Sequence, residues 1–235
     1  MHTIYYRTGF GDTDKSGMLS PAASVRLLQD CAMFQLEGDE HFRHFSTKYN
    51  IGCFLVSRQI QFERMPRMGE ELRITTGICA CKSSYGQRNT IIYDESDTPC
   101  VIATEVGAFV HRVTGAPYAL PPGAYADIVD CEPYPMDYES RKITIPSELT
   151  FTELERTKVY DSYLDSNRHL NAVQGLQLVM KHVDFAYRKL RGNYRNQATL
   201  GETLIIDGAA VGDQHRILRL HNGEGKIFTT HEFKV

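Results

Sequence analysis

The stretch that decides the fold occurs twice: residues 12–20 read DTDKSGMLS, and residues 163–171 read YLDSNRHLN. The two stretches share three residues at matching positions: an aspartate, a leucine and a polar residue that can cap a helix. The matched pairs are Asp14 with Asp165, Leu19 with Leu170, and Ser20 with Asn171. A helix-like apolar run follows each stretch. Because self-similarity at a fixed offset is typical of duplicated structure, we predict two copies of one folding unit.

Each predicted helix begins at a polar capping residue. Ser20 can accept a hydrogen bond from an unpaired backbone N–H, and Pro21 suits the first helical turn. Asn171 can cap the second helix in the same way. Apolar residues then recur at three- and four-residue steps, as in a helix with one buried face. They are Val25, Leu28, Cys31 and Ala32 in the first run, and Val173, Leu176, Val179, Met180, Val183 and Tyr187 in the second.

Alternating apolar residues predict antiparallel strands after each helix. They cover residues 72–78, 90–93 and 101–110 in the first half, and 204–206, 217–220 and 227–230 in the second. Gly69 and Gly201 occupy matching turns ahead of these strands, and a proline-rich stretch separates the halves. We therefore predict an α+β double hotdog, in which each unit is a long central helix wrapped by an antiparallel sheet. The N-terminal unit covers residues 1–120, a linker covers 121–145, and the C-terminal unit covers 146–235.

Composition excludes several classes of protein. The 26 Lys and Arg residues against 29 Asp and Glu give a net charge of −3, whereas a general nucleic-acid binder carries a basic excess. No apolar run approaches the roughly 20 residues of a membrane-spanning helix, and the first residues do not resemble a signal peptide. The six cysteines show neither C-x-x-C pairs nor zinc-finger spacing, so we expect reduced, packed thiols. A cytoplasmic location is the resulting expectation.

The second copy of the repeated stretch carries chemistry that the first copy lacks. Asp165, Asn167 and His169 precede a helix, where unpaired N–H groups and the helix dipole favour negative charge. A carbonyl placed there is polarised, and its tetrahedral oxyanion is stabilised. The first copy has Ser16 and Met18 at the positions of the amide and the imidazole. Since the turn forms without those groups, folding alone does not require them, and we predict a catalytic site in the second half only.

Four segments, in the same order, resemble the family of bacterial acyl-acyl-carrier-protein (acyl-ACP) thioesterases, relatives of the plant fatty-acyl thioesterases. Residues 165–171 match the pattern D-x-N-x-H-x-N of that family. Residues 27–32 read LLQDCA, residues 64–70 read RMPRMGE, and residues 114–117 read TGAP, each similar to a family motif. The resemblance covers nearly the whole chain.

The resemblance implies a tandem hotdog enzyme that hydrolyses a fatty acyl thioester on the phosphopantetheine arm of acyl carrier protein. It assigns catalysis to Asp165, Asn167 and His169, with water activated by the carboxylate and the imidazole, while the amide positions either the thioester or the water. It implies no metal and no organic cofactor. Asn171 and Gln197 are supporting candidates. The acyl chain is expected along the first helix, where the candidate lining residues are Leu28, Met33 and Phe34.

One departure from the family pattern leaves alternatives open. Family members often place Glu, sometimes followed by Cys, where this chain has Gln197 and Ala198. An amide can form hydrogen bonds but cannot take a proton, so a second catalytic acid is missing. An acyl-CoA thioesterase of the hotdog superfamily and a non-catalytic protein that binds acyl thioesters therefore remain alternatives. Chain-length preference and a homodimer stay undetermined from the sequence.

Overall fold

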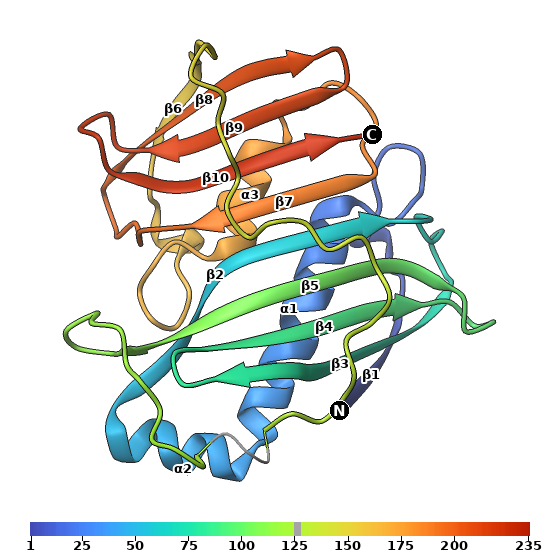
Figure 1. Cartoon of the computed structure of the whole chain (residues 1–235). Helices are drawn as coiled ribbons and strands as arrows, with labels where there is room; N and C mark the ends of the chain where they lie inside the picture. Colours follow the sequence, from blue (N-terminus) through green and yellow to red (C-terminus); the bar gives the residue numbers. More distant parts are fainter. Residues whose placement is uncertain (125–127) are drawn as a thin grey trace. The chain divides into compact units, whose positions relative to one another are not determined.

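The computed structural model describes residues 1–124 and 128–235, and these form two compact units (Figure 1). The first unit contains Met1–Val56 and Ile60–Tyr138, and the second contains Ser57–Gln59 and Glu139–Val235. The division after residue 138 falls within the segment interpreted as a linker, of which residues 125–127 lie outside the described residues.

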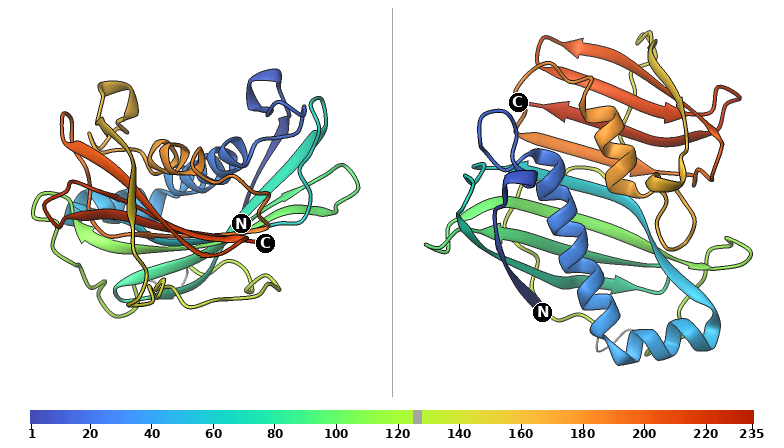
Figure 2. Two further views of the ribbon diagram at one scale, coloured as in Figure 1. Left: turned by 90° about the horizontal axis from the view of Figure 1, so that it is seen from above. Right: turned by 180° about the vertical axis from the view of Figure 1, so that it is seen from behind.

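The first unit is an antiparallel sheet with a long helix on one face. Helix α1 (Pro21–Gly38) crosses the sheet, as Figure 2 shows in its right-hand view. The strand order is β1-β3-β4-β5-β2. The strands are β1 (His2–Arg7), β2 (Ile51–Phe62), β3 (Glu71–Lys82), β4 (Tyr85–Tyr93) and β5 (Pro99–His111). Every strand predicted for this half lies within one of these elements.

Helix α1 begins where the sequence predicts. The Ser20 hydroxyl accepts a hydrogen bond from the N–H of Ala23 at 3.2 Å, and Pro21 is the first helical residue. The predicted apolar face is buried against the sheet, with Val25 and Leu28 inaccessible to solvent. The capping and core predictions for this helix are confirmed.

The second unit repeats the arrangement of sheet and helix. Its strand order is β7-β10-β9-β8-β6, and helix α3 (Ala172–Met180) begins at Asn171, as predicted. The strands are β6 (Thr152–Lys158), β7 (Lys189–Tyr194), β8 (Thr203–Gly212), β9 (His215–His221) and β10 (Ile227–Lys234). A short 3-10 turn leads into the repeated stretch in each unit and ends at its first residue: η1 (Phe10–Asp12) in the first unit and η2 (Asp161–Tyr163) in the second.

The end of the second helix corrects the sequence analysis. The predicted apolar stripe of this helix reaches Val183 and Tyr187, but α3 ends at Met180. The next two side chains, Lys181 and His182, bind the Glu155 carboxylate of β6 at 2.7 and 2.8 Å. Apolar residues after His182 recur at every second position, which is the period of a strand and not of a helix. The Tyr187 ring, at the end of this segment, packs edge-on against Phe233 of β10.

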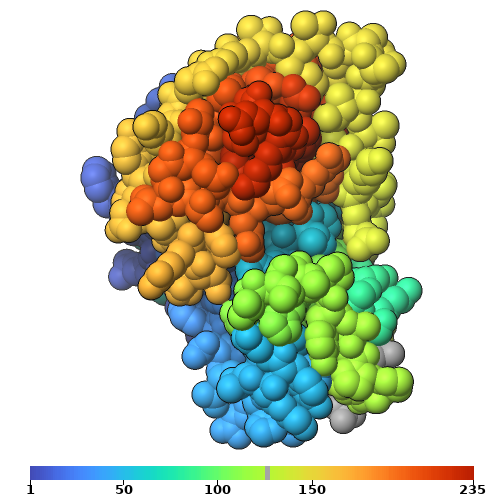
Figure 3. Space-filling model, turned by 90° about the vertical axis from the view of Figure 1, so that its left-hand side faces the viewer, coloured from blue at the N-terminus to red at the C-terminus, as the bar shows by residue number. Residues whose placement is uncertain are grey.

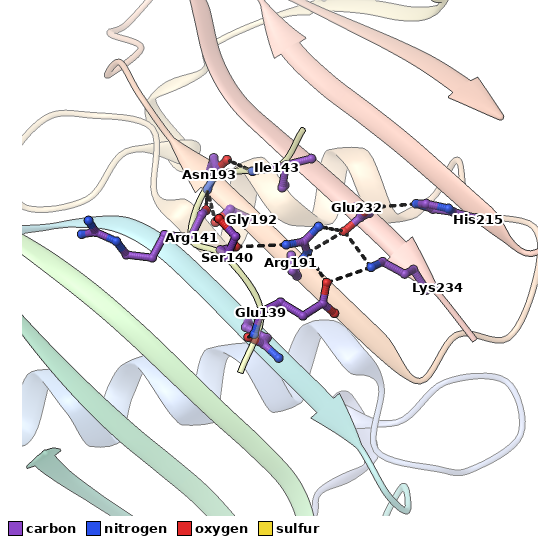
Figure 4. A network of polar contacts seen from close by, with 11 residues as sticks. Glu139, Ser140, Arg141, Ile143, Arg191, Gly192, Asn193, His215, Glu232 and Lys234 are labelled. Atoms are coloured by element: carbon purple, nitrogen blue, oxygen red, sulfur yellow. Dashed lines mark hydrogen bonds and ion pairs between the residues drawn. The ribbon is translucent and has the colours of Figure 1, made fainter. Parts of the chain in front are cut away.

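The beginning of the second unit is fastened to strand β7 by a network of polar contacts (Figure 4). The buried Asn193 amide accepts a hydrogen bond from the N–H of Ile143 at 2.8 Å and donates one to the carbonyl of Arg141. Arg191 donates to the carbonyl of Ser140 at 3.0 Å. The same guanidinium pairs with the buried Glu232, which also bonds to His215 and Lys234. The backbone of Ser140, Arg141 and Ile143 belongs to no strand, and its polar groups are satisfied by side chains of strand β7.

Candidate catalytic turn

The repeated stretch folds into the same turn in both units. In the second unit, Oδ1 of Asp165 accepts hydrogen bonds from the N–H groups of Asn167 at 2.8 Å and His169 at 3.3 Å. In the first unit, Oδ1 of Asp14 accepts from the two matching N–H groups at the same two distances. The backbone bond that closes each turn, from the aspartate N–H to the carbonyl four residues later, measures 2.8 Å in both units.

This equivalence divides the signature into two kinds of residue. Asp165 has a structural task that Asp14 performs equally well in the other copy. Asn171 is also structural, since its Oδ1 accepts from the N–H of Val173 at 2.8 Å and thereby caps α3, as Ser20 caps α1. Neither copy needs an amide or an imidazole to form the turn. Asn167 and His169 therefore carry the amide and the imidazole that the turn itself does not require.

His169 carries a buried nitrogen without a hydrogen-bond partner. Its side chain is half-buried, and Nδ1 has no partner among the residues that the structure describes. A buried polar atom left unsatisfied costs about 1–3 kcal/mol, so such an atom in a native structure requires an explanation. A water molecule or the substrate at this nitrogen would supply one. Asn167 is exposed on the same turn, and Figure 3 shows the light-orange atoms of this part of the chain at the molecular surface.

The segment containing Gln197 and Ala198 lies beside the signature turn. The N–H of Leu170 donates to the Ala198 carbonyl at 2.8 Å, and Ala198 is buried. Gln197 is exposed, and within the described part of the chain no hydrogen bond joins its side chain to His169. The position at which the family pattern often has a carboxylate is thus next to the turn, and an exposed amide occupies it.

The residues suggested for the acyl chain do not share one surface. Leu28 is fully buried in the core under α1, whereas Met33 and Phe34 are 52% and 53% exposed on the same helix. The structure brings together Asp165, Asn167 and His169, which lie on one turn, but it does not bring these three apolar side chains together.

The thiols are not activated as nucleophiles, and the described residues contain no cluster suited to a metal ion. All six cysteines are free thiols, and burial raises the pKa of each one. A raised pKa lowers the fraction of nucleophilic thiolate at neutral pH. No group of three or more His, Cys, Asp or Glu residues in the described ranges is arranged to hold a metal ion. No helix there is long and apolar enough to cross a membrane.

No protein-family model and no curated protein matches this sequence, but solved structures match it over its full length. An acyl-ACP thioesterase from Bacteroides thetaiotaomicron has a TM-score of 0.86 at 19% identity, covering 99% of this chain and 96% of that one. A 12:0-ACP thioesterase from Umbellularia californica has a TM-score of 0.84 at 14% identity, covering 99% and 92%. The fold is the predicted double hotdog. The structural resemblance to acyl-ACP thioesterases is confirmed at the level of this fold.

Another solved structure matches a smaller part of the chain. A protein from Staphylococcus aureus, solved in complex with CoA, has a TM-score of 0.51 at 14% identity. It covers 62% of this chain and 95% of its own length.

Several structural residues were missed by the sequence analysis. Helix α2 (Glu40–Tyr49) begins after Asp39, whose side chain accepts from the N–H of Phe42 at 2.9 Å. That capping signal was present in the sequence. The buried His231 of β10 was also missed, and no local pattern marks it, because its burial depends on strands distant in sequence.

Proposed function

We propose that this protein hydrolyses fatty acyl thioesters of acyl carrier protein, releasing a free fatty acid and the carrier thiol. The observation that carries the proposal is the difference between the two copies of one turn. The same backbone hydrogen bonds form in both copies, but the first copy carries Ser16 and Met18 where the second carries Asn167 and His169. In the second copy, Nδ1 of His169 is buried without a partner among the described residues. Polar groups that folding does not require, placed ahead of a helix, are well suited to acyl chemistry.

The reaction needs only water as co-reactant. His169 accepts one proton from a water molecule that Asp165 holds and polarises by accepting a hydrogen bond, and the water oxygen attacks the thioester carbonyl carbon. Since Oδ1 of Asp165 holds the turn, Oδ2 is the oxygen assigned to the water. The Asn167 amide and the N–H groups at the start of α3 stabilise the resulting oxyanion. The tetrahedral intermediate then collapses, the C–S bond breaks, and the imidazolium returns its proton to the leaving thiolate.

The first experiment is a panel of acyl-ACP thioesters of different chain lengths, with released fatty acid as the readout. His169→Ala should lower kcat by about 10²–10⁴-fold, the usual contribution of a general base, while acyl ligand still binds. Met18→Ala is the matched control, because it alters the same turn position in the first unit. A His169→Ala enzyme as fast as the parent would show that the assigned site is wrong.

Two alternatives have specific support. The CoA complex of the S. aureus protein favours an acyl-CoA thioesterase, and hydrolysis of one acyl group on both carriers distinguishes the two substrates. The exposed Gln197 in place of a carboxylate favours a protein that binds acyl thioesters without hydrolysing them. In that case acyl-ACP would bind to the parent protein with no release of fatty acid. Sedimentation of the purified chain tests whether it forms a homodimer.

A further inference from the structure

Arg168 stands in a backbone conformation that arginine rarely adopts. Its φ is +63°, in the left-handed region, and the matching residue of the first unit is Gly17 with φ +75°. The left-handed backbone conformation brings the Cβ close to a carbonyl oxygen and costs roughly 1–2 kcal/mol per residue. Glycine has no Cβ and avoids this cost. The other non-glycine residues with positive φ in the described ranges are Asn50 and Asp97, which belong to the types that tolerate it best. The second copy of the turn thus places an arginine where the first copy has the residue that the backbone favours.

Among the residues that the structure describes, the Arg168 guanidinium also has no compensating contact. The side chain is exposed, and it has no ion pair and no hydrogen bond to another described residue. Two other arginines of the second unit are paired, Arg156 with Glu153 at 2.9 Å and Arg191 with Glu232. The backbone N–H of Arg168 donates to the Asp165 carbonyl at 2.9 Å, but this bond needs no arginine side chain. A strained residue whose side chain makes no internal contact indicates a task outside the chain.

The position of this cation relative to the reacting groups suggests the task. Arg168 lies between Asn167 and His169 on one tight turn, so a positive charge stands at the edge of the proposed site. The protein as a whole carries a net charge of −3 and therefore repels anions at long range. A local cation changes the potential within about 8 Å at physiological ionic strength. An anionic substrate approaching this turn would meet attraction there.

We propose that Arg168 is a specificity-determining residue that attracts the negatively charged carrier of the acyl thioester. The proposal rests on the proposed function, because both carriers of acyl thioesters are anionic. CoA carries phosphate groups, and acyl carrier protein carries a phosphate on its arm together with an acidic surface. The shared chemistry is an anion next to the thioester-bearing arm, and the guanidinium acts on its binding rather than on the bond that breaks.

The test compares one acyl chain on three carriers: neutral N-acetylcysteamine, CoA and acyl carrier protein. At low salt, Arg168→Gln and Arg168→Gly should lower kcat/KM by about three- to tenfold on the two anionic carriers, mainly through KM. Hydrolysis of the neutral thioester should stay within about twofold, and the difference should vanish at high salt, where charges are screened. Arg168→Lys keeps the charge and should remain close to the parent.

Arg188→Gln is the matched control for the loss of one positive charge. Arg188 is exposed and lies before β7, whereas Ala198, which contacts the turn, lies after that six-residue strand. At about 3.3 Å per residue the two ends of β7 are roughly 20 Å apart, so this charge should not affect either carrier. If Arg168→Gln lowers kcat/KM only for the thioester of acyl carrier protein, the attraction acts on the acidic surface of that protein. If kcat/KM falls equally for the CoA thioester, the attraction acts on the phosphate that both carriers share.

Two results would overturn the proposal: an equal loss on the neutral thioester, which would indicate a merely structural role, or no loss on either anionic carrier. Failure of the proposed function is recognised separately, because the parent would then hydrolyse none of the three thioesters. In that case calorimetry with a thioether analogue of acyl-CoA still tests Arg168. Its Kd should rise by about three- to tenfold in Arg168→Gln, and an unchanged Kd would refute the inference.

Discussion

Replacing Asp14 or Asp165 with alanine removes the same two hydrogen bonds from equivalent turns. Both carboxylates accept from backbone N–H groups two and four residues ahead, at 2.8 and 3.3 Å. Losing such a capping side chain costs about 1–2 kcal/mol. Asp14 has one additional bond, from the Ser16 hydroxyl at 2.6 Å, which is the main cause of its lowered pKa. Asp14→Ala should therefore be slightly more destabilising than Asp165→Ala.

The asparagine variants separate this structural role from the chemical one. Asparagine keeps an oxygen that can accept the two turn bonds but lacks the negative charge with which the carboxylate polarises the water. Asp14→Asn and Asp165→Asn should both leave Tm within about 2 °C of the parent, since 1 kcal/mol shifts Tm by about 2–4 °C at this chain length. Only Asp165→Asn should lower kcat, by about 10²-fold or more.

Thermal unfolding and initial rates of acyl-ACP hydrolysis on the same four preparations provide the measurement. Equal losses of kcat in Asp14→Asn and Asp165→Asn would show that the two copies are not chemically different. An Asp165→Asn enzyme with the parent's kcat would restrict this residue to holding the turn. Either result would refute the reasoning that assigns Asp165 two roles.

Three further outcomes follow from other sites. Burial, together with nearby Arg58, lowers the pKa of His231 to about 3, so the unfolded chain takes up this proton first as the pH falls. The free energy of unfolding should therefore drop by about 2–3 kcal/mol between pH 6.5 and 4.5, and His231→Leu should flatten this slope in urea titrations. Asn193→Leu strips the bonds to Ile143 and Arg141, and should lower stability by about 2–3 kcal/mol in the same assay. Iodoacetamide at pH 7.5 should leave hydrolysis unchanged, because burial raises the pKa of every thiol.

The features predicted correctly from the sequence are those fixed by local physical chemistry. Ser20 and Asn171 cap their helices because the groups they satisfy lie two or three residues away. Gly69 and Gly201 both adopt positive φ, at +89° and +81°, in matching turns. Such features need no knowledge of the tertiary structure, so a repeated pattern was sufficient to predict two similar units.

The features missed depend on contacts between distant segments. The end of α3 is set by Glu155, whose carboxylate binds Lys181 and His182 from 26 and 27 residues away. The attachment of Ile143 to Asn193 spans 50 residues, and neither residue belongs to a recognisable motif. At the candidate site, the sequence indicated which groups could react, whereas the shared role of Asp165 and the strain at Arg168 became visible only in the backbone geometry.

The duplicated turn allows one more change whose structural outcome the protein itself already demonstrates. In the first unit the turn holds serine and methionine with the same hydrogen bonds, so Asn167→Ser combined with His169→Met should fold normally in the second unit. The change also removes the buried, unpartnered Nδ1 of His169, so the free energy of unfolding should equal or exceed that of the parent. Hydrolysis should nevertheless be lost. If this double variant were as stable as the parent and still active, the chemistry would lie elsewhere in the molecule, and the difference between the two copies would have no catalytic meaning.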